Sequence, residues 1–526
     1  MTQAEPVQQP TSLLEALDCS CSRWAPRPAL VCGGHSVRYE VFRNRARSLA
    51  SAYTDLGIRP GDRILCQLSN CPEHLIAVYG AWTCGAVHAG IDRQSTPAEL
   101  ASRAALIDPA AIVYESPSGD WDEALQMLRR RCPNAKIIVK TCARIAPGFL
   151  SLGELIGTGA ASSDFQKQQS DCPAVIFFSS GTTGKPKAAI GLHDNLQKRW
   201  LRLSMKLGFS PEDVHLAHLP LAHGFGLMMA MSALLTGGRL VLMDGFSRDV
   251  VFRILEEEGI TVLNGSSAHF QLVASRLECG QSAPGSLRVG VGSAAAFPLP
   301  LLRTILNEWG IQFMFMYGSS EGVGVVTTDR NDILLGSVGR PAPGSVAIQD
   351  TEGCPLPVGQ AGEIVFSRRV FPVRYWGAHV DGAGVENSAS IGDWFHSGDR
   401  GRLDEEGRLY VLGRMQLQIN RGGLKIDPAE VEQAIQELPG IADAIVIGVH
   451  DSIVGERVFA FVVPADESAL TLEYLRIALS KSLAHFKLPE GLQILDRIPL
   501  TSVGKPDLES LRKGAPDLVR NDIAQN

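Results

Sequence analysis

The sequence has no hydrophobic stretch long enough to cross a membrane and no apolar signal core at its start. Its longest apolar runs fall well short of the roughly 20 residues that a membrane-spanning helix requires, and the first ten residues, Met1–Pro10, are polar. The last three residues, Ala-Gln-Asn, do not form a peroxisomal signal. We therefore expect a cytoplasmic protein without a membrane partner.

An excess of basic residues and a metal-binding cysteine pattern are also lacking. The chain has 49 Lys and Arg against 56 Asp and Glu, a formal charge of −7, whereas nucleic-acid-binding proteins are usually basic. Its 11 cysteines are scattered, and the close pair Cys19 and Cys21 has no second pair at zinc-site spacing. We expect no nucleic-acid partner and, from the odd cysteine count, buried thiols in a reducing compartment.

The composition is that of a globular protein with more than one domain. The chain has 526 residues, of which 45% are apolar and 20% charged, so it exceeds one ordinary hydrophobic core. Strand-like and helix-like segments alternate up to about residue 170 and again up to about residue 411, which predicts parallel sheets covered by helices. Examples are a hairpin over Leu30–Val37, a helix over Tyr39–Gly57, a strand over Arg63–Gln67 and a helix over Glu73–Gly85.

The pattern changes after Arg414, where a smaller unit begins. Asp427 is a suitable N-cap for a helix with proline at its first position. The elements predicted for this unit are a helix over Pro428–Leu438, strands over Ala444–Val449 and Val458–Val463, and a helix over Leu472–Leu483. We predict an N-terminal domain of residues 1–413 and an α+β C-terminal domain of residues 414–526, with a hinge near Gln416.

The chain is organised around the segment Phe177–Lys187. An apolar run, Ala174–Phe178, predicts a buried strand, and it leads into a loop of Ser, Thr and Gly followed by two lysines. Glycine lets an anion approach the backbone N–H groups, so the chemistry is that of a phosphate loop. It is not a Walker loop, because Ser179 stands where the first glycine is needed and Pro186 follows the first lysine. A plain surface turn is the alternative.

This segment resembles the signature loop of the AMP-forming adenylating enzymes, a superfamily that includes acyl- and aryl-CoA ligases, adenylation domains and firefly luciferase. Further motifs follow in the superfamily's order over roughly residues 10 to 515. The resemblance implies a large N-terminal domain of layered α/β subdomains, with mixed and parallel sheets and a small β-barrel-like part, and a small mobile α+β C-terminal domain. The implied ATP-phosphate residues are Ser179, Ser180, Gly181, Thr182, Thr183, Gly184 and Lys187.

A second motif, Tyr317–Glu321, offers groups for the rest of the nucleotide. A tyrosine ring gives a flat face for a purine, the Ser320 hydroxyl suits the α-phosphate, and a carboxylate is a hard oxygen ligand for Mg²⁺. The small residues Gly292–Ala295 form a tight turn if read alone, but they resemble the turn whose backbone approaches adenine. The implied residues are Ser293, Ala294, Tyr317, Gly318, Ser319 and Ser320 for the nucleotide and Glu321 for Mg²⁺.

Three later residues complete the nucleotide site by the same resemblance, although each read alone is a turn or surface residue. Asp399 lies in the superfamily's Gly-Asp element and can accept hydrogen bonds from both ribose hydroxyls. Arg414 could reach the same ribose or a phosphate. Lys505 matches the late lysine that bridges the carboxylate and the α-phosphate during adenylation, where a cation offsets the repulsion of two anions.

The acid-binding residues are also carried over from the superfamily. His223 read alone is a core histidine, but its counterpart helps to close the acid site and opens the way for the thiol. Amino-acid-activating relatives have an aspartate where this chain has Gly226–Met229, so an α-amino acid would leave a buried ammonium unpaired. The implied pocket is apolar, lacks a counter-charge and suits an aromatic or short-to-medium aliphatic acid; it comprises His223, Phe225, Gly292, Ser293, Met316, Gly322 and Val323.

The chain departs from the superfamily's pattern at the hinge, where Gln416 replaces the usual Asp or Lys. A hinge needs only permissive backbone angles, so we expect the rotation of the C-terminal domain to persist. Gly422 and Gly423 match the glycines that line the pantetheine channel in relatives.

The implied activity is the ATP- and Mg²⁺-dependent conversion of a small carboxylic acid to an acyl-adenylate and then to a thioester. Lys505, His223 and Glu321 are the implied catalytic residues. Coenzyme A is the favoured thiol, because the chain ends about 20 residues after Lys505 and no carrier domain follows. The phosphopantetheine of a separate carrier protein would use the same channel, and the sequence does not separate the two. A non-catalytic nucleotide-binding protein is a further alternative.

Overall fold

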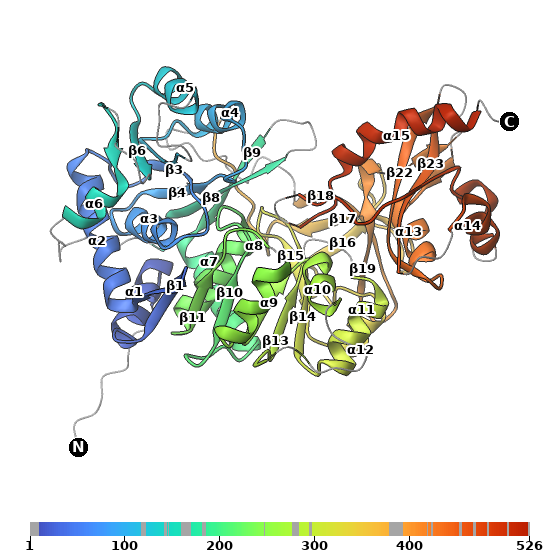
Figure 1. The fold of residues 1–526 in the computed structure, drawn as a ribbon, viewed down its shortest axis with the longest axis horizontal. Coiled ribbons are helices and arrows are strands. Elements are labelled where there is room, and N and C mark those ends of the chain that lie inside the picture. The colour runs from blue at the N-terminus through green and yellow to red at the C-terminus, as the bar shows by residue number, and fades with distance from the viewer. Residues whose placement is uncertain are drawn as a thin grey trace.

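Two large sheets and two smaller ones form the α/β fold of the chain (Figure 1). The computed structural model describes residues 10–116, 123–140, 145, 147–158, 170–180, 186–246, 248–275, 283, 285–293, 297–377, 393–417, 419–421, 424–451, 455–465, 470–480, 483–501 and 504–523. The C-terminal elements, coloured orange to red, lie at one end of the molecule, beside the two large sheets.

The first large sheet has seven strands: β3 (Arg63–Gln67), β4 (Val87–Gly90), β5 (Ala111–Glu115), β6 (Lys136–Lys140), β7 (Leu150–Ser151), β8 (Pro173–Ser180) and β9 (Pro186–Leu192). Their order is β7-β6-β5-β3-β4-β8-β9, and neighbours run parallel except at the β8–β9 edge. This antiparallel hairpin brackets the predicted phosphate loop.

The second large sheet has eight strands: β1 (Pro28–Cys32), β2 (His35–Arg38), β10 (Val214–Ala217), β11 (Arg239–Leu242), β12 (Val262–Gly265), β13 (Val289–Gly292), β14 (Gln312–Gly318) and β15 (Gly324–Thr327). Their order is β15-β14-β13-β12-β10-β11-β1-β2, parallel inside with an antiparallel pair at each edge. The carboxyl ends of the inner strands therefore share one edge, where α/β sheets usually bind ligands.

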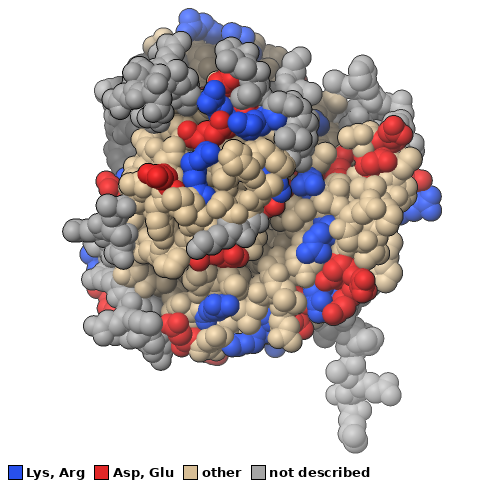
Figure 2. All heavy atoms as spheres, turned by 90° about the vertical axis from the view of Figure 1, so that its right-hand side faces the viewer, with Lys and Arg blue, Asp and Glu red and all other residues tan. Residues whose placement is uncertain are grey.

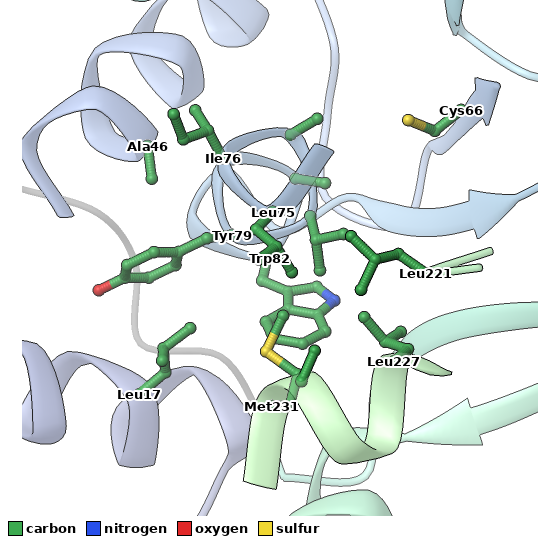
Figure 3. Packing of buried hydrophobic residues seen from close by; sticks show 14 of the residues in the cluster. Leu17, Ala46, Cys66, Leu75, Ile76, Tyr79, Trp82, Leu221, Leu227 and Met231 are labelled. Atoms are coloured by element: carbon green, nitrogen blue, oxygen red, sulfur yellow. The ribbon is translucent and has the colours of Figure 1, made fainter. Parts of the chain in front are cut away.

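Six helices contribute to a core shared by the two large sheets: α1 (Leu13–Arg23), α2 (Tyr39–Asp55), α3 (Pro72–Thr83), α6 (Leu152–Thr158), α7 (His193–Lys206) and α8 (Gly224–Leu235). Trp82 of α3 is fully buried there, and its indole N–H donates to Ala174 O at 2.9 Å. Leu227 and Met231 of α8 lie against its ring (Figure 3). This contact fixes α8 and the loop that precedes it relative to β8.

The remaining helices of this part cover other surfaces: α4 (Pro97–Ile107), α5 (Glu123–Arg131), α9 (Arg248–Glu257), α10 (Ser267–Ala274), α11 (Leu299–Arg303) and α12 (Arg330–Leu334). Apolar residues of α4 and α5 pack on the seven-stranded sheet, and those of α9, α10 and α11 pack on the eight-stranded sheet. Each large sheet is therefore covered on both faces, as parallel sheets require.

Two smaller sheets complete the fold. The four-stranded antiparallel sheet, β16 (Val346–Gln349), β17 (Gly362–Ser367), β18 (Trp394–Leu403) and β19 (Leu409–Arg414), corresponds to the predicted small β part. The five-stranded sheet has β20 (Ile419–Arg421), β21 (Leu424–Ile426), β22 (Ile441–Asp451), β23 (Gly455–Pro464) and β24 (Gly491–Ile494). Its two apolar clusters include residues of α13 (Pro428–Gln436) and α14 (Leu472–Leu479), and of α15 (Leu508–Ile523).

Most of the predicted elements are present. The hairpin turns at Gly33 and Gly34, which both have positive φ, and β3 has the predicted bounds. Asp427 caps α13 by accepting a hydrogen bond from the Ala429 N–H group. The prediction was wrong at the end of α14, which stops at Leu479 rather than four residues later, and α15 was not predicted.

No helix in the described part of the chain is long and apolar enough to span a membrane. On the face formed by the C-terminal region, acidic and basic side chains are interspersed (Figure 2). Cysteines within the described ranges are free thiols, and burial raises the pKa of Cys71 and Cys84 to about 11, so these thiols are protonated at neutral pH.

Candidate active site

The predicted phosphate loop is shorter than expected, because the strands on both sides extend into it. β8 runs to Ser180, β9 starts at Pro186, and these residues are paired across the hairpin. Ser179, Ser180 and Lys187, expected in the loop, lie on the strands, because their antiparallel pairing continues the ladder past the apolar run. Gly181, Thr182, Thr183, Gly184 and Lys185 lie outside the described residues.

Tyr375 connects this hairpin to the Tyr317–Glu321 motif. Its segment is bound to β9, where Trp376 N–H donates to Ala188 O at 2.8 Å. The Tyr375 hydroxyl donates to Glu321 Oε1 at 3.3 Å, and Lys187 Nζ lies 5.5 Å from the centre of the tyrosine ring. We did not predict this link, because a loop tyrosine carries no periodic signal and its position depends on pairing with β9.

The carboxylate of Glu321 can be compared with what magnesium requires. Among the described residues, no group of three or more His, Cys, Asp or Glu side chains is arranged to hold a metal ion. Magnesium is usually held by one or two carboxylates together with substrate phosphates and water. Glu321, beside the phosphate hairpin, fits an ion that arrives with ATP.

Tyr317, Asp399 and Arg414 form one hydrogen-bonded set although they lie far apart in the sequence. Tyr317 Oη donates to Asp399 Oδ2 at 2.6 Å, and Arg414 Nε lies 2.8 Å from Asp399 Oδ1. Sheet geometry brings them together, because β18 and β19 pair Asp399 with Arg414 and Tyr317 lies near the carboxyl end of β14.

The electrostatics of this set follow from its burial. The Asp399 side chain is 13% exposed, and burial raises the pKa of its carboxyl group while Arg414 and then Tyr317 lower it. Burial and then the Asp399 charge raise the pKa of Tyr317. The phenol therefore keeps its proton at neutral pH and serves as a donor to the carboxylate.

Lys505 approaches Asp399 and Arg414 from the C-terminal region. Its turn is closed by two hydrogen bonds, from Thr501 N–H to Lys505 O at 2.7 Å and from Gly504 N–H to Thr501 O at 2.9 Å. Lys505 retains solvent access, but the surrounding protein and then the Arg414 charge lower the pKa of its ammonium group, whereas Asp399 raises it. A cation is held next to residues that were predicted to bind the nucleotide.

His223 is the N-cap residue of α8 and contacts Asp92. Its Nε2 atom lies 3.1 Å from Asp92 Oδ2. Asn70 holds the preceding loop, since its side chain accepts from Leu221 N–H at 3.1 Å and donates to Leu219 O at 2.9 Å. We predicted His223 but missed Asp92, whose only signal in the sequence is a carboxylate soon after a strand.

Residues of the predicted acid pocket gather at the carboxyl ends of β13 and β14. Phe225 and Met316 pack against one apolar cluster. Gly292 ends β13, and a Cβ atom there would lie 2.6 Å from Phe313 and 2.7 Å from Phe297, so a larger residue would collide with two rings. Ser293 and Val323 are buried next to the ends of the same two strands.

The turn between β14 and β15 carries the rest of the predicted nucleotide and pocket residues. Gly318 pairs with Gly324, and a Cβ atom on Gly318 would lie 2.7 Å from Val323 O. Ser319 N–H donates to the same carbonyl at 3.1 Å, and Ser320 follows in the turn. The glycine is required here because the two strand backbones approach closely.

Arg199 adds a cation that the predicted pocket lacked. Its Nη1 donates to Gly322 O at 2.5 Å, and Gly322 has a φ of +85°. Arg199 retains solvent access, although the surrounding protein lowers the pKa of its guanidinium group. No carboxylate within the described ranges forms an ion pair with it. We did not predict Arg199, because an arginine on an amphipathic helix ordinarily faces solvent.

Some predicted residues cannot be assessed from the structure. Ala294, Gly422 and Gly423 lie outside the described residues. Gln416 is described only by its backbone, which forms a short helical turn over Met415–Leu417 between β19 and β20.

A late lysine beside a Tyr–Asp–Arg set, with Glu321 linked through Tyr375 to the predicted phosphate hairpin, indicates an AMP-forming ligase. Residues 17–376 match the family described as AMP-binding enzyme, and residues 430–505 match the AMP-binding enzyme C-terminal domain. The chain therefore belongs to the AMP-binding enzyme family.

Individual relatives cover nearly the whole chain. Triostin synthetase I from Streptomyces triostinicus is 31% identical over 95% of this chain and 93% of its own length. Feruloyl-CoA synthase from an Amycolatopsis species is 30% identical over 90% of this chain and 93% of its own. The crystal structure of ATP-bound MatB from Rhodopseudomonas palustris is 26% identical, with a TM-score of 0.78 over 95% of this chain and 99% of that one.

Proposed function

We propose that the protein activates an aromatic carboxylic acid with Mg·ATP and transfers the acyl group to coenzyme A. The acid carboxylate attacks the α-phosphorus, a P–O bond to the leaving pyrophosphate breaks, and an acyl-adenylate forms. The thiol then attacks the acyl carbon, AMP leaves with the bonding electron pair, and the thiol proton passes to solvent.

The observation that carries this proposal is the meeting of Lys505 with the Tyr317, Asp399 and Arg414 set. Asp399 would accept hydrogen bonds from the ribose hydroxyls, and Arg414 would bind the ribose or a phosphate. Lys505 would offset the repulsion between the carboxylate and the α-phosphate. The cationic charge next to Asp399 and Arg414 supports this role.

The phosphates would be held by the β8–β9 hairpin and the neighbouring turns. Backbone and hydroxyl donors of the loop, with Lys187, would bind the phosphates, and Glu321 would hold Mg²⁺. Tyr375 supports this arrangement, because it contacts both Lys187 and Glu321. The other proposed nucleotide residues are Ser179, Ser180, Gly181, Thr182, Thr183, Gly184, Ser293, Ala294, Gly318, Ser319 and Ser320.

Two domain orientations would separate the half-reactions. Residues 1–413 and 414–526 would form the two domains, and Gln416 would be the hinge. Rotation would withdraw Lys505 and bring Gly422 and Gly423 to the thiol channel, while His223 would open the way to the acyl carbon. The short helical turn at Met415–Leu417, which joins the four- and five-stranded sheets, supports this position of the hinge.

An aromatic acid is proposed because the pocket residues are apolar and the feruloyl-CoA synthase relative acts, by its name, on an aromatic acid. Phe225, Met316 and Val323 would contact the ring. Arg199, which donates to Gly322 O, would add a cation at one side of the pocket, so we favour a ring with a hydrogen-bond-accepting substituent.

The first experiment is mass spectrometry of one reaction with purified protein, Mg·ATP, coenzyme A and a panel of benzoic, cinnamic and aliphatic acids. An aryl-CoA ester with stoichiometric AMP is the expected product. Acid-dependent pyrophosphate release without a CoA ester would indicate a carrier-protein phosphopantetheine as acceptor. Absence of acid-dependent nucleotide turnover with all the acids would contradict the proposal.

A further inference from the structure

Gly504 packs directly against His269, although the two residues lie in different parts of the fold. Gly504 lies between β24 and α15 in the C-terminal region, whereas His269 lies on α10 beside the eight-stranded sheet. Gly504 is buried, and a Cβ atom on it would overlap the His269 ring and lie 2.7 Å from Ser266 Oγ. Its φ of +73° favours glycine. The residue next to Lys505 is therefore in contact with the N-terminal end of α10.

His269 belongs to a small group of stacked rings. Its ring centre lies 4.7 Å from that of His218 and 4.6 Å from that of Phe246, and the last two are 4.5 Å apart. His218 follows β10, Phe246 follows β11 and His269 lies on α10 after β12. The group, which we call the ring seat, stands at the edge where the inner strands end.

The His269 ring is held in one orientation. Ser266 N–H donates to its Nδ1 atom at 3.0 Å, and Ser266 Oγ lies 2.9 Å from the same atom. Nδ1 is therefore an acceptor, and the ring proton of the neutral imidazole is on Nε2. Burial lowers the pKa of His269 to about 4, so the ring is uncharged at neutral pH and does not repel the nearby lysine.

We propose that His269 is a positioning residue for the adenylation step, because Gly504 docks on its ring and thereby holds Lys505 at the nucleotide site. The inference rests on the proposed role of Lys505. The inference goes further than that role, because it names the surface against which the turn that carries Lys505 packs. Small displacements of a charged group from its productive position are costly for catalysis, so loss of the seat reduces adenylation while the chain stays folded.

The turn itself supports this role, because Gly504 and Lys505 are both hydrogen-bonded to Thr501. Two hydrogen bonds close it, Leu500 pairs with Pro506, and Asp507 N–H donates to Pro499 O at 2.8 Å. Lys505 follows Gly504 directly and has its backbone N–H 3.3 Å from Thr501 Oγ1. A shift of the glycine would therefore move the lysine.

The test compares two half-reactions in the full-length protein. Acid-dependent exchange of pyrophosphate into ATP reports adenylation, and thioester formation from supplied acyl-adenylate and coenzyme A reports the second step. His269→Ala is expected to slow adenylation at least tenfold while the second step changes less than threefold. Gly504→Ala is expected to do the same, because its new Cβ atom meets the ring.

Controls separate positioning from stability. The ratio of the two rates does not depend on how much of the protein is folded, and thermal unfolding checks each variant. His193→Ala is the matched control, since His193 is also a buried histidine but contacts Trp82 instead; its ratio should stay unchanged. If His269→Ala does not fold, Gly504→Ala, in a turn, carries the same test.

A reference variant distinguishes failure of this inference from failure of the proposed function. In one outcome, Lys505→Ala lowers the ratio of adenylation to thioester formation while His269→Ala and Gly504→Ala leave it unchanged. In that case the positioning role of the ring seat is wrong and the proposed role of Lys505 stands. If Lys505→Ala also leaves the ratio unchanged, both are overturned. In the double variant, removal of the ring should make the added Cβ less harmful, so the two effects on adenylation should not add.

Discussion

At the scale of single residues, the candidate site depends on contacts between side chains that no local pattern connects. Tyr317, Asp399 and Arg414 are separated by up to 97 residues in the chain, yet they share one carboxylate. Each residue type could be assigned from a family motif, but the hydrogen bond from Tyr317 could not, because it depends on how the four-stranded sheet lies against β14.

The ribose role of Asp399 gives the first prediction. Asp399→Ala removes the acceptor for two ribose hydroxyls, and charge-assisted hydrogen bonds contribute about 1.5–3 kcal/mol. The KM for ATP should therefore rise roughly 10- to 100-fold while the KM for the acid changes less than about threefold. Steady-state kinetics at saturating co-substrate measure both. Asp393→Ala, an exposed position beside β18, is the control, and unchanged ATP affinity in Asp399→Ala would remove Asp399 from the nucleotide site.

Arg199 gives a prediction about the acid. Arg199→Met keeps much of the side-chain volume but removes the charge at Gly322, so acids with a polar ring substituent should lose their advantage over benzoate by roughly tenfold in kcat/KM, about 1.4 kcal/mol. Lys198→Met, on the same helix but paired with Asp194 at 3.2 Å, should leave this ratio unchanged. An equal ratio in Arg199→Met and the wild type would show that the guanidinium does not contact the acid.

At the scale of elements, strands and helices with strong patterns followed from the sequence. The β1–β2 hairpin, α2, β3 and the N-cap of α13 were predicted because glycine, proline and apolar spacing determine them locally. The first arm of the phosphate hairpin, predicted over Ala174–Phe178, was predicted too short, and the second arm, β9, was not predicted. Ser179 and Lys187 have no strand signal of their own, and their pairing becomes favourable only once β8 and β9 are next to each other.

The helix layer between the two large sheets can be tested through Trp82. Its ring is fully buried among residues of α3 and α8 and donates to Ala174 O. Trp82→Ala should lower the free energy of unfolding by about 3–5 kcal/mol, because it leaves a large cavity. Urea denaturation measures this, and Leu335→Ala, at a side chain that is 56% exposed, should cost less than about 0.5 kcal/mol. A loss below 1 kcal/mol would contradict the packing.

At the scale of the whole molecule, six histidines of the described residues are buried and neutral. Burial lowers the pKa of four of them to about 4: His74, His193, His215 and His269. It lowers the pKa of His88 and His218 further. An unfolded histidine titrates near 6.5, so their stabilisation is complete above that pH and is lost as the pH falls.

This predicts marked acid sensitivity. At pH 5 the unfolded chain binds protons at these positions and the folded chain does not, which costs at most about 2 kcal/mol for each histidine. The sum is comparable with the typical total stability of about 5–15 kcal/mol, so the protein should unfold near pH 5. Urea denaturation between pH 7 and 5 measures the effect. His88→Leu should reduce the pH dependence, and a change below 2 kcal/mol in the wild type would contradict the prediction.

The sequence by itself determined the family, the residue types of the site and most of the regular elements. These depend on local spacing and on chemistry that a short motif specifies. Tertiary structure decided which of those residues meet. Asp92 with His223, Tyr375 with Glu321, Arg199 with Gly322 and Gly504 with His269 are contacts across sheets. They arise because the packing of separate elements, which no window of sequence encodes, brings distant side chains within a few ångströms.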